Sequence, residues 1–410
     1  MSRQPNRLPS GGRIDRAMPL GFRFDGRSYT GYAGDTLASA LLANDVHLVG
    51  RSFKYHRPRG ILGLGAEEPN ALVELRRGAR QEPNTRATMA ELFGGLDARS
   101  QNYRGSLKYD LLAVNDLFSP FLSAGFYYKT FMWPKSFWEK LYEPSIRGAA
   151  GLGRLSREPD PDVYDKGYLH CDILVIGAGP SGLSAALTAG RAGVRVILAD
   201  EDFRIGGRLN AETLGVNGMA GSDWADAARA ELAAMDNVRV MTRTTVFGAY
   251  DHGVYGAIER QTDHLPHSSG KPRQVLWRIY TRRAIVCAGA TERSIAFPDN
   301  DRPGVMLAGG VRAYANRFAV GTGRSVAIFT NNDTGWRTAS DLSAKGISIA
   351  AIIDVRETTP LATPRGAAVV MGGRVTGTKG RHGVSSITLA GGQTIECDCL
   401  AASGGRGPTG

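Results

Sequence analysis

The chain has 410 residues, a formal charge of +11 and four cysteines. This length predicts more than one domain at about 150 residues each, the cysteines are too few for a disulfide framework, and the scattered basic residues accompany no nucleic-acid-binding motif. No apolar run approaches the ~18 residues of a membrane-spanning helix and the first residues hold no apolar signal core, so we expect a cytoplasmic protein with neither a nucleic-acid nor a membrane partner.

The N-terminal part of the sequence predicts an arm followed by a small α+β domain. Residues 1–18 are polar and glycine-rich, which is typical of a flexible arm. Within residues 19–90, strand patterns on either side of Asp25-Gly26 predict a hairpin. A helix pattern at 36–43 and a strand pattern at 71–75 complete the domain.

This N-terminal pattern resembles the ferredoxin-like β-grasp domain of amine oxidase and cyanide synthase subunits. No cysteine precedes Cys171, so an iron–sulfur cluster, whose ligands are thiolates, is excluded. Cations and aromatic residues interleave at 51–59, and this segment is suited to hold a phosphate or to pack against a partner.

Residues 91–168 form an aromatic-rich wrapping segment and a linker. Ten aromatic residues lie between Phe118 and Tyr142. Two interpretations stay open: the rings are buried on their own chain, or they form a docking surface, since aromatic side chains anchor protein interfaces. Lys129 and Lys135 exclude a membrane span.

Residues 169–320 begin with the most informative motif of the chain. A β-branched strand pattern at 173–176 leads into glycines at the G-x-G-x-x-G spacing of dinucleotide-binding folds. Gly177 permits a tight turn, Gly179 removes a Cβ that would block a pyrophosphate, and Gly182 lets the helix approach the strand. Free N–H groups at the helix start bind phosphates. The predicted phosphate-binding residues are Gly177, Ala178, Gly179, Pro180, Ser181 and Gly182.

A second apolar strand pattern ends at Asp200, where a carboxylate can accept hydrogen bonds from ribose hydroxyls. Glu201 and Asp202 follow directly, and these acids would repel a 2′-phosphate, which argues against NADP, although Arg204 and Arg208 leave some room for it. The motif does not separate FAD from NAD, because both contain the same ADP half.

Residues 321–395 predict a second, degenerate copy of this unit. A strand, a helix and another strand follow one another from 325 to 353, but the loop at 330–335 lacks the glycine of closest phosphate approach. We therefore expect the fold without a second nucleotide. Before this unit, residues 274–287 predict a hairpin, and after it residues 396–410 return to the first domain.

No catalytic or metal-binding constellation is evident in the sequence. The seven histidines are dispersed, and a single histidine is more often structural than catalytic. Cys397 and Cys399 alternate along a strand and are expected to point into a core. We therefore assign no catalytic residue and no metal ligand.

Several motifs together resemble the two-dinucleotide-domain flavoproteins: the glycine motif, Ala-Gly-Ala-Thr-Glu-Arg at 288–293 and Cys-Asp-Cys-Leu-Ala-Ala-Ser-Gly-Gly at 397–405. Arg-Ser-Phe-Lys-Tyr-His-Arg-Pro-Arg-Gly at 51–60 and Glu-Pro-Asn-Ala at 68–71 narrow the resemblance to the α subunits of heterotetrameric sarcosine oxidases. The resemblance implies an α/β, Rossmann-like two-dinucleotide-binding-domain fold, preceded by the ferredoxin-like β-grasp domain without cluster cysteines. The family's α subunits are longer, so the chain resembles their N-terminal portion.

The resemblance also implies an enzyme of α, β, γ and δ subunits that oxidises sarcosine to glycine, giving formaldehyde or methylene-tetrahydrofolate and hydrogen peroxide. In that family the α subunit carries NAD, whereas FAD, FMN and the amine-oxidising site belong mainly to β. Tetrahydrofolate binds in a later part of α, and this chain is not expected to be catalytic alone. Beyond the glycine turn, the expected NAD contacts are Asp200, Glu201, Asp202, Gly207, Arg208, Val246, Ala288 and Gly289.

Two other functions stay open from the sequence. One is an analogous subunit of an opine, amino-acid or cyanide-forming dehydrogenase. The other is a free-standing FAD-dependent NAD(P)H oxidoreductase, which would be yellow when purified because flavin absorbs visible light and NAD does not.

Overall fold

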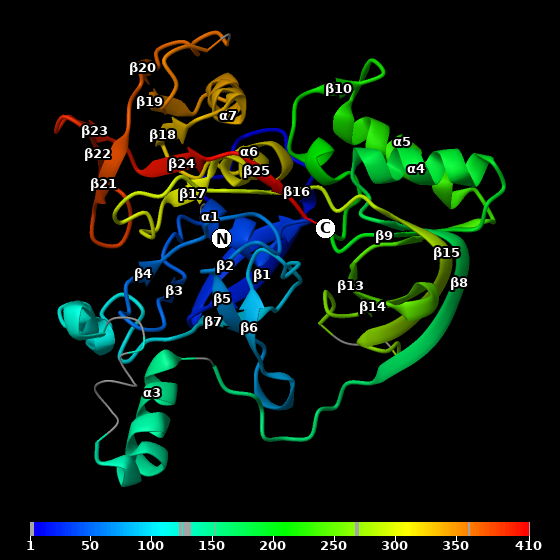
Figure 1. The fold of residues 1–410 in the computed structure, drawn as a ribbon, viewed down its shortest axis with the longest axis horizontal. Helices are drawn as coiled ribbons and strands as arrows, with labels where there is room; N and C mark the ends of the chain where they lie inside the picture. Colours follow the sequence, from blue (N-terminus) through cyan, green and yellow to red (C-terminus); the bar gives the residue numbers. More distant parts are fainter. Residues whose placement is uncertain are drawn as a thin grey trace.

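The chain folds into an N-terminal unit and two nucleotide-type units, drawn in blue, in green and in yellow to red in Figure 1. The computed structural model describes residues 4–122, 125, 133–151, 153–266, 270–359 and 361–409. Within these ranges, no helix is both long enough and apolar enough to cross a membrane.

The N-terminal unit is a five-stranded sheet in the order β2-β1-β7-β5-β6. Its first two strands form the predicted hairpin, and Asp25 and Gly26 turn with positive φ values of 47° and 78°. The sheet extends past residue 90, because β7 pairs with both β1 and β5. The elements are β1 (Asp15–Phe24), β2 (Arg27–Ala33), α1 (Leu37–Ala43), β3 (Gly50–Arg51), β4 (Pro58–Arg59), β5 (Leu72–Leu75), η1 (Gly78–Arg80), β6 (Glu82–Arg86) and β7 (Asp97–Ser100).

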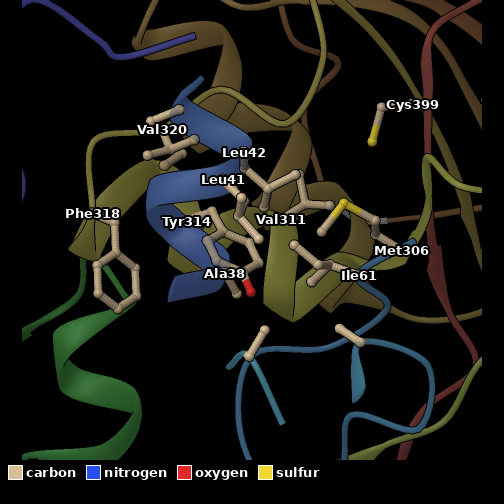
Figure 2. Close-up of a cluster of buried hydrophobic side chains, with 14 of the residues drawn as sticks. Ala38, Leu41, Leu42, Ile61, Met306, Val311, Tyr314, Phe318, Val320 and Cys399 are labelled. Carbon is tan, nitrogen blue, oxygen red and sulfur yellow. The ribbon is translucent and has the colours of Figure 1, made fainter. Parts of the chain in front are cut away.

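Helix α1 joins the N-terminal unit to the rest of the molecule. It starts with a capping box, in which Thr36 and Ser39 each accept a hydrogen bond from the other's backbone N–H. All its residues are buried, and Figure 2 shows Leu41 close to Val311 and Tyr314 of α6 (Ala308–Arg317). The N-terminal unit and the second nucleotide-type unit therefore share one hydrophobic core.

The described part of the expected arm is docked on this core. Leu8 donates its backbone N–H to Ala319 at 2.8 Å. The guanidinium of Arg7 bonds both carboxylate oxygens of Asp35, at 3.1 and 2.6 Å, and both side chains are buried. From residue 4 onward, the arm is thus a fixed strap, contrary to the prediction of a flexible arm.

The aromatic-rich segment crosses the surface in short helical turns and ends in α3, which stands apart from the three units in Figure 1. Several of its apolar side chains face solvent, with exposed fractions of 80% for Leu117, 74% for Phe121 and 84% for Trp133. Phe126, Tyr127, Tyr128 and Phe131 lie outside the described residues. The elements are η2 (Leu111–Asp116), η3 (Ser119–Leu122), η4 (Lys135–Phe137), η5 (Trp138–Tyr142) and α3 (Glu143–Ala150).

The first nucleotide-type unit is a six-stranded sheet in the order β12-β9-β8-β15-β14-β13. The first four strands run parallel, while β15, β14 and β13 form an antiparallel meander. Because β15 pairs with β8 from Gln274 to Val286, the hairpin predicted at 274–287 is wrong. The elements are β8 (Tyr164–Ile176), α4 (Pro180–Arg191), β9 (Val196–Ala199), η6 (Gly207–Asn210), β10 (Gly215–Val216), β11 (Met219–Ala220), α5 (Gly221–Ala233), β12 (Val238–Met241), β13 (Thr244–Tyr250), η7 (Asp251–Gly253), β14 (Val254–Arg260) and β15 (Gln274–Val286).

The second nucleotide-type unit is a parallel sheet in the order β17-β24-β18-β19-β20, with a small antiparallel sheet beside it. Helix α6 and β17 belong to this unit although they precede residue 321, and β24 belongs to it although it follows residue 396. Contrary to the predicted return of residues 396–410, β25 does not join the six-stranded sheet of the first unit and pairs with β16 in a separate two-stranded sheet. The elements are β16 (Ala290–Glu292), β17 (Val305–Leu307), β18 (Ser325–Thr330), α7 (Asp333–Ala344), β19 (Ser348–Asp354), β20 (Ala368–Met371), β21 (Val375–Lys379), β22 (Ser386–Leu389), β23 (Thr394–Glu396), β24 (Cys399–Ser403) and β25 (Arg406–Pro408).

Candidate functional site

The loop between β8 and α4 has two glycines that the fold itself requires. Gly177 has a φ of 101°, and a Cβ there would collide with the carbonyl oxygen of Cys287. A Cβ at Gly182 would collide with the carbonyl oxygen of Gly177. Both positions therefore exclude any side chain, whatever ligand is bound.

Gly179 is different, because it leaves space for a ligand. A Cβ built on Gly179 meets no described atom within 4 Å. Gly179 is the N-cap of α4, no side chain caps this end, and Pro180 occupies the first turn. The open face of the loop thus meets the positive end of a helix dipole, an arrangement that favours a phosphate group.

Asp200, at the end of β9, ties the loop to the strand. Its Oδ2 accepts the backbone N–H of Ala178 at 2.5 Å, and its Oδ1 accepts that of Asp202 at 2.8 Å. Burial raises the pKa of this carboxyl to about 6, although the two N–H groups act in the opposite direction. Each carboxylate oxygen still has a further lone pair for a ribose hydroxyl.

Asp202 is engaged elsewhere. Its carboxylate pairs with Arg317 of α6, with one contact at 2.8 Å, and also accepts the backbone N–H of Arg204. The ring of Phe203 lies 4.9 Å from the Arg317 guanidinium. The structure therefore places Asp202 in an ion pair that joins the two nucleotide-type units, instead of leaving it beside a ribose.

Of three other predicted residues, one lies against the loop and two make contacts elsewhere. Gly207 lies against the loop, since a Cβ there would be 3.1 Å from Cα of Gly179. Arg208 forms an ion pair with Glu212. Glu201 is partly buried, and burial raises its pKa, while Arg260 donates to its backbone carbonyl at 2.6 Å.

The segment after β15 closes the other side of the loop. Cys287 donates its backbone N–H to Ile176 at 2.7 Å, which places Ala288 and Gly289 directly after the contact with Gly177. Val246, in contrast, packs half-buried against the core on the meander. The structure thus brings together the glycine turn, Asp200, Gly207 and the 288–289 segment, while Val246 occupies a core position.

The sequence did not indicate that Cys287 and Arg317 shape this site. Cys287 acts through its backbone carbonyl, which sits where a side chain at Gly177 would be. Arg317 comes from another unit, 115 residues after its partner Asp202. The apolar run at 284–286, although largely exposed in the structure, was the local signal that a strand leads to Cys287.

The loop of the second unit is closed. A Cβ at Gly335 would lie 2.5 Å from the Thr330 side chain, so that side chain fills the space next to the helix. Asp354, which ends β19 as Asp200 ends β9, is fully buried and accepts the indole N–H of Trp336 at 2.7 Å. Arg356 bonds Asp354 and also Asp333 at 2.8 Å. The groups that would meet a ribose are therefore paired with each other.

The site offers binding groups but no reactive thiol. Cys397 and Cys399 are buried as predicted, and burial raises the pKa of each thiol to about 12. Glu292 is partly buried, which raises its pKa, and it bonds Ser403 and the backbone of Gly309. In the described ranges, no three His, Cys, Asp or Glu side chains gather as metal ligands do.

Two families match parts of the chain. Residues 17–103 match the 2Fe-2S iron-sulfur cluster binding domain, and residues 172–259 match the FAD dependent oxidoreductase family. The first match contains no cysteine, so this domain has the fold but not the ligands of a cluster. The second match contains the open glycine loop and Asp200, which fit the ADP half of a dinucleotide.

The fold and this loop together define an α/β protein with the nucleotide-binding architecture of flavoproteins. The chain is 56% identical over 406 residues to the sarcosine oxidase subunit alpha of Rhizobium meliloti (strain 1021), with 98% of this chain and 41% of that protein covered. It is 35% identical over 427 residues to the sarcosine oxidase subunit alpha of Corynebacterium sp. (strain U-96), with 99% and 40% covered. The chain spans about two-fifths of the length of these relatives and belongs, over that span, to the family of sarcosine oxidase α subunits.

A solved structure shares the whole architecture. The L-proline dehydrogenase from P. horikoshii covers 98% of this chain and 63% of its own length with a TM-score of 0.65, at 17% sequence identity. At this identity the likeness shows the fold alone, and it agrees with the predicted two-dinucleotide-domain architecture with a small N-terminal domain.

Proposed function

We propose that this chain is the NAD-binding part of the α subunit of a sarcosine oxidase complex. The main support is the 56% identity to a sarcosine oxidase α subunit along almost the entire chain. The loop geometry agrees with this, because the face of Gly179 is open and the start of α4 has no side-chain cap. NAD, and not a flavin, is assigned here because the family resemblance implies that FAD and FMN belong to the β subunit.

In this proposal the chain binds the nucleotide without taking part in bond-making. The backbone at Gly179 to Gly182 holds the pyrophosphate, and Asp200 holds a ribose through its free lone pairs. The dinucleotide supplies a nicotinamide ring, but the described residues place no thiolate or paired carboxylates at the loop. Oxidation of sarcosine to glycine is assigned to the flavins of the partner β subunit, and γ, δ and the folate-binding part of α complete the complex.

A substrate assay on the assembled complex tests this proposal. Sarcosine should be oxidised with release of hydrogen peroxide, and the isolated α subunit should show no activity. Octopine and glycine serve as comparison substrates. If octopine or glycine is oxidised in preference to sarcosine, the complex belongs to the opine-type or cyanide-forming class instead.

A second candidate is FAD at the same loop. The FAD dependent oxidoreductase match over residues 172–259 favours it, because this stretch contains every glycine of the loop. FAD and NAD share the ADP half that this loop would contact. The two candidates differ in whether the α chain carries a flavin. Mass spectrometry of the nucleotides released from the denatured complex determines this.

A further inference from the structure

A cavity of about 920 Å³ lies between the N-terminal unit and the second nucleotide-type unit. Its walls come from the β1–β2 hairpin, the segment 103–109, and the segments around Arg324 and His382. This volume falls in the range of small-ligand pockets, roughly 300–1,000 Å³. None of these walls belongs to the glycine loop, so the cavity is separate from the dinucleotide site.

The carboxylates that face this cavity are already engaged by internal donors. Each of the three accepts hydrogen bonds from side chains or backbone N–H groups close to it. None of them forms an ion pair with Arg27, Lys108 or Arg324 in the described part of the chain, although the pKa of the Asp45 carboxyl is lowered by His47 and, at longer range, by Arg324. Asp25 accepts hydrogen bonds from the backbone N–H and the hydroxyl of Ser100. Asp45 accepts one from the Asn6 side chain and contacts the His47 ring, and Asp398 accepts the backbone N–H groups of Arg324 and Ser325.

The cationic side chains at the cavity make no ion pair within the part of the chain that the structure describes. Lys108 and Arg381 lie over the ring of Tyr109, at 5.8 and 5.6 Å from its centroid. The cations without an ion pair are Arg27, Lys108 and Arg324, which line the cavity, and Arg381, which adjoins it over the ring of the lining residue Tyr109.

His382 supplies a second, independent sign of a ligand. Both of its ring nitrogens are buried, and neither has a hydrogen-bond partner among the described residues. Burial, and then Arg381, Arg51 and Lys108, lower its pKa, so at pH 7 the imidazole is neutral, with one donor and one acceptor nitrogen. Buried polar atoms without partners cost free energy, and a bound ligand would supply the missing partner.

The wall that carries these groups is held in place. Arg51 donates to the backbone carbonyls of Leu107 and Lys108 at 2.6 and 3.0 Å. Asp110 accepts the backbone N–H of Arg104 at 2.8 Å and contacts the buried His56 ring at 2.6 Å. Because the wall is already ordered, little conformational entropy would be lost on binding.

We propose that this cavity binds a small molecule carrying a phosphate group, with the phosphate at the end formed by Lys108, Arg381 and His382. A phosphate brings a charge of about −1.5 to −2 and three acceptor oxygens, which matches an ammonium, a guanidinium and an imidazole N–H. A single carboxylate brings half that charge and fewer acceptors. The remaining volume accommodates the organic part of the ligand beside Tyr109.

Calorimetric titration of the assembled, NAD-saturated complex with inorganic pyrophosphate tests this proposal, with citrate as the carboxylate comparison. Pyrophosphate should bind saturably, and Lys108→Ala or Arg381→Ala should weaken its binding at least tenfold. Arg365→Ala, which removes an exposed arginine elsewhere on the second unit, should leave binding unchanged. Unaltered NAD content and unfolding temperature would show that the variants are folded.

Three results would overturn the proposal. If pyrophosphate fails to bind, or binds equally well to Lys108→Ala and Arg381→Ala, the cavity is not a phosphate site. Tighter binding of citrate than of pyrophosphate would remove the phosphate assignment. Loss of pyrophosphate binding in Gly179→Val would place it at the glycine loop; retained binding in that variant separates this site from the proposed NAD site.

Discussion

At the scale of single residues, the three glycines of the loop have different functions. Gly177 and Gly182 are fixed by collisions with backbone carbonyl oxygens, so they serve the fold. Gly179 faces open space, so it serves a ligand. The sequence spacing predicted this division between Gly179 and the other two glycines, and the structure supplies the contacts that account for it.

Alanine substitution should separate these functions. Gly182→Ala should lower the free energy of unfolding by about 3 kcal/mol or more, because its Cβ would overlap a backbone carbonyl that cannot move cheaply. Gly179→Ala should leave stability nearly unchanged, since its Cβ meets nothing. Thermal unfolding followed by circular dichroism measures both. Equal destabilisation in the two variants would contradict this account of the loop.

Asp200 should make stability depend on pH. Its pKa is about 6 in the folded protein against an ordinary value of 3.8, so the folded state holds this proton more tightly than the unfolded chain does. The associated stability is present below about pH 4 and is lost as the pH rises through about 6. The total loss is up to about 3 kcal/mol, at ~1.4 kcal/mol per pKa unit.

Unfolding of Asp200→Asn between pH 4 and 7 measures this contribution. The decrease in stability over this interval should be smaller in the variant than in the wild type, by the contribution of Asp200. Asp172→Asn is the matched control, because Arg195 lowers the pKa of the Asp172 carboxyl to about 2 and this group does not titrate here. A wild-type pH profile that persists in Asp200→Asn would show that another group titrates.

Asp202 shows where sequence reasoning stops at this scale. Its place beside Asp200 suggested a ribose contact, but the structure pairs it with Arg317 of α6. Nothing near either residue in the sequence indicates this pairing, because it depends on how the two nucleotide-type units pack. Asp200, whose position follows from the strand end alone, could be predicted.

At the scale of elements, the second nucleotide-type unit repeats the fold without the binding surface. The sequence predicted its strands and helix from apolar periodicity, and it predicted the missing glycine. The closed hydrogen-bond set of Asp354, Trp336 and Arg356 could not be predicted, because it joins the helix, the strand end and the loop beyond.

This unit should therefore bind no second nucleotide. Titration of the NAD-saturated complex with NADH should show no further saturable event at micromolar concentration, because the ribose-facing carboxylate is paired and the loop is filled. The same titration on a nucleotide-free complex should show one site per α chain. A second saturable event in the NAD-saturated complex would contradict this prediction.

The misassigned hairpin at 274–287 has a similar explanation. Arg282 and Arg283 interrupt the apolar pattern and suggested a turn, yet β15 runs through them. Their side chains are exposed, and Arg282 lies near Asp172 of the neighbouring β8. In a sequence, two adjacent charged residues within a strand resemble a turn when the neighbouring strand is not known.

At the scale of the whole molecule, the aromatic-rich segment indicates a partner surface. Of its two interpretations, exposure of the described side chains Leu117, Phe121 and Trp133 favours docking over burial on the chain itself. Exposed apolar groups of this size are stabilised when a partner covers them. The proposed partner is the flavin-bearing β subunit.

The double substitution Trp133→Ala and Trp138→Ala tests this surface. It should reduce the yield of co-purified β subunit severalfold, because large aromatic anchors contribute much of an interface's free energy. NAD content per α chain should not change, since the segment lies apart from the glycine loop. Unchanged complex yield combined with a less stable α chain would show that these rings belong to the chain's own core.

The nucleotide content of the α chain tests the central claim most directly. Mass spectrometry of the denatured complex should find one NAD for each α chain, and Gly179→Val should remove that NAD while FAD and FMN stay constant, because valine fills the open face where the pyrophosphate lies. Loss of FAD in place of NAD from Gly179→Val would contradict the account and assign this loop to a flavin.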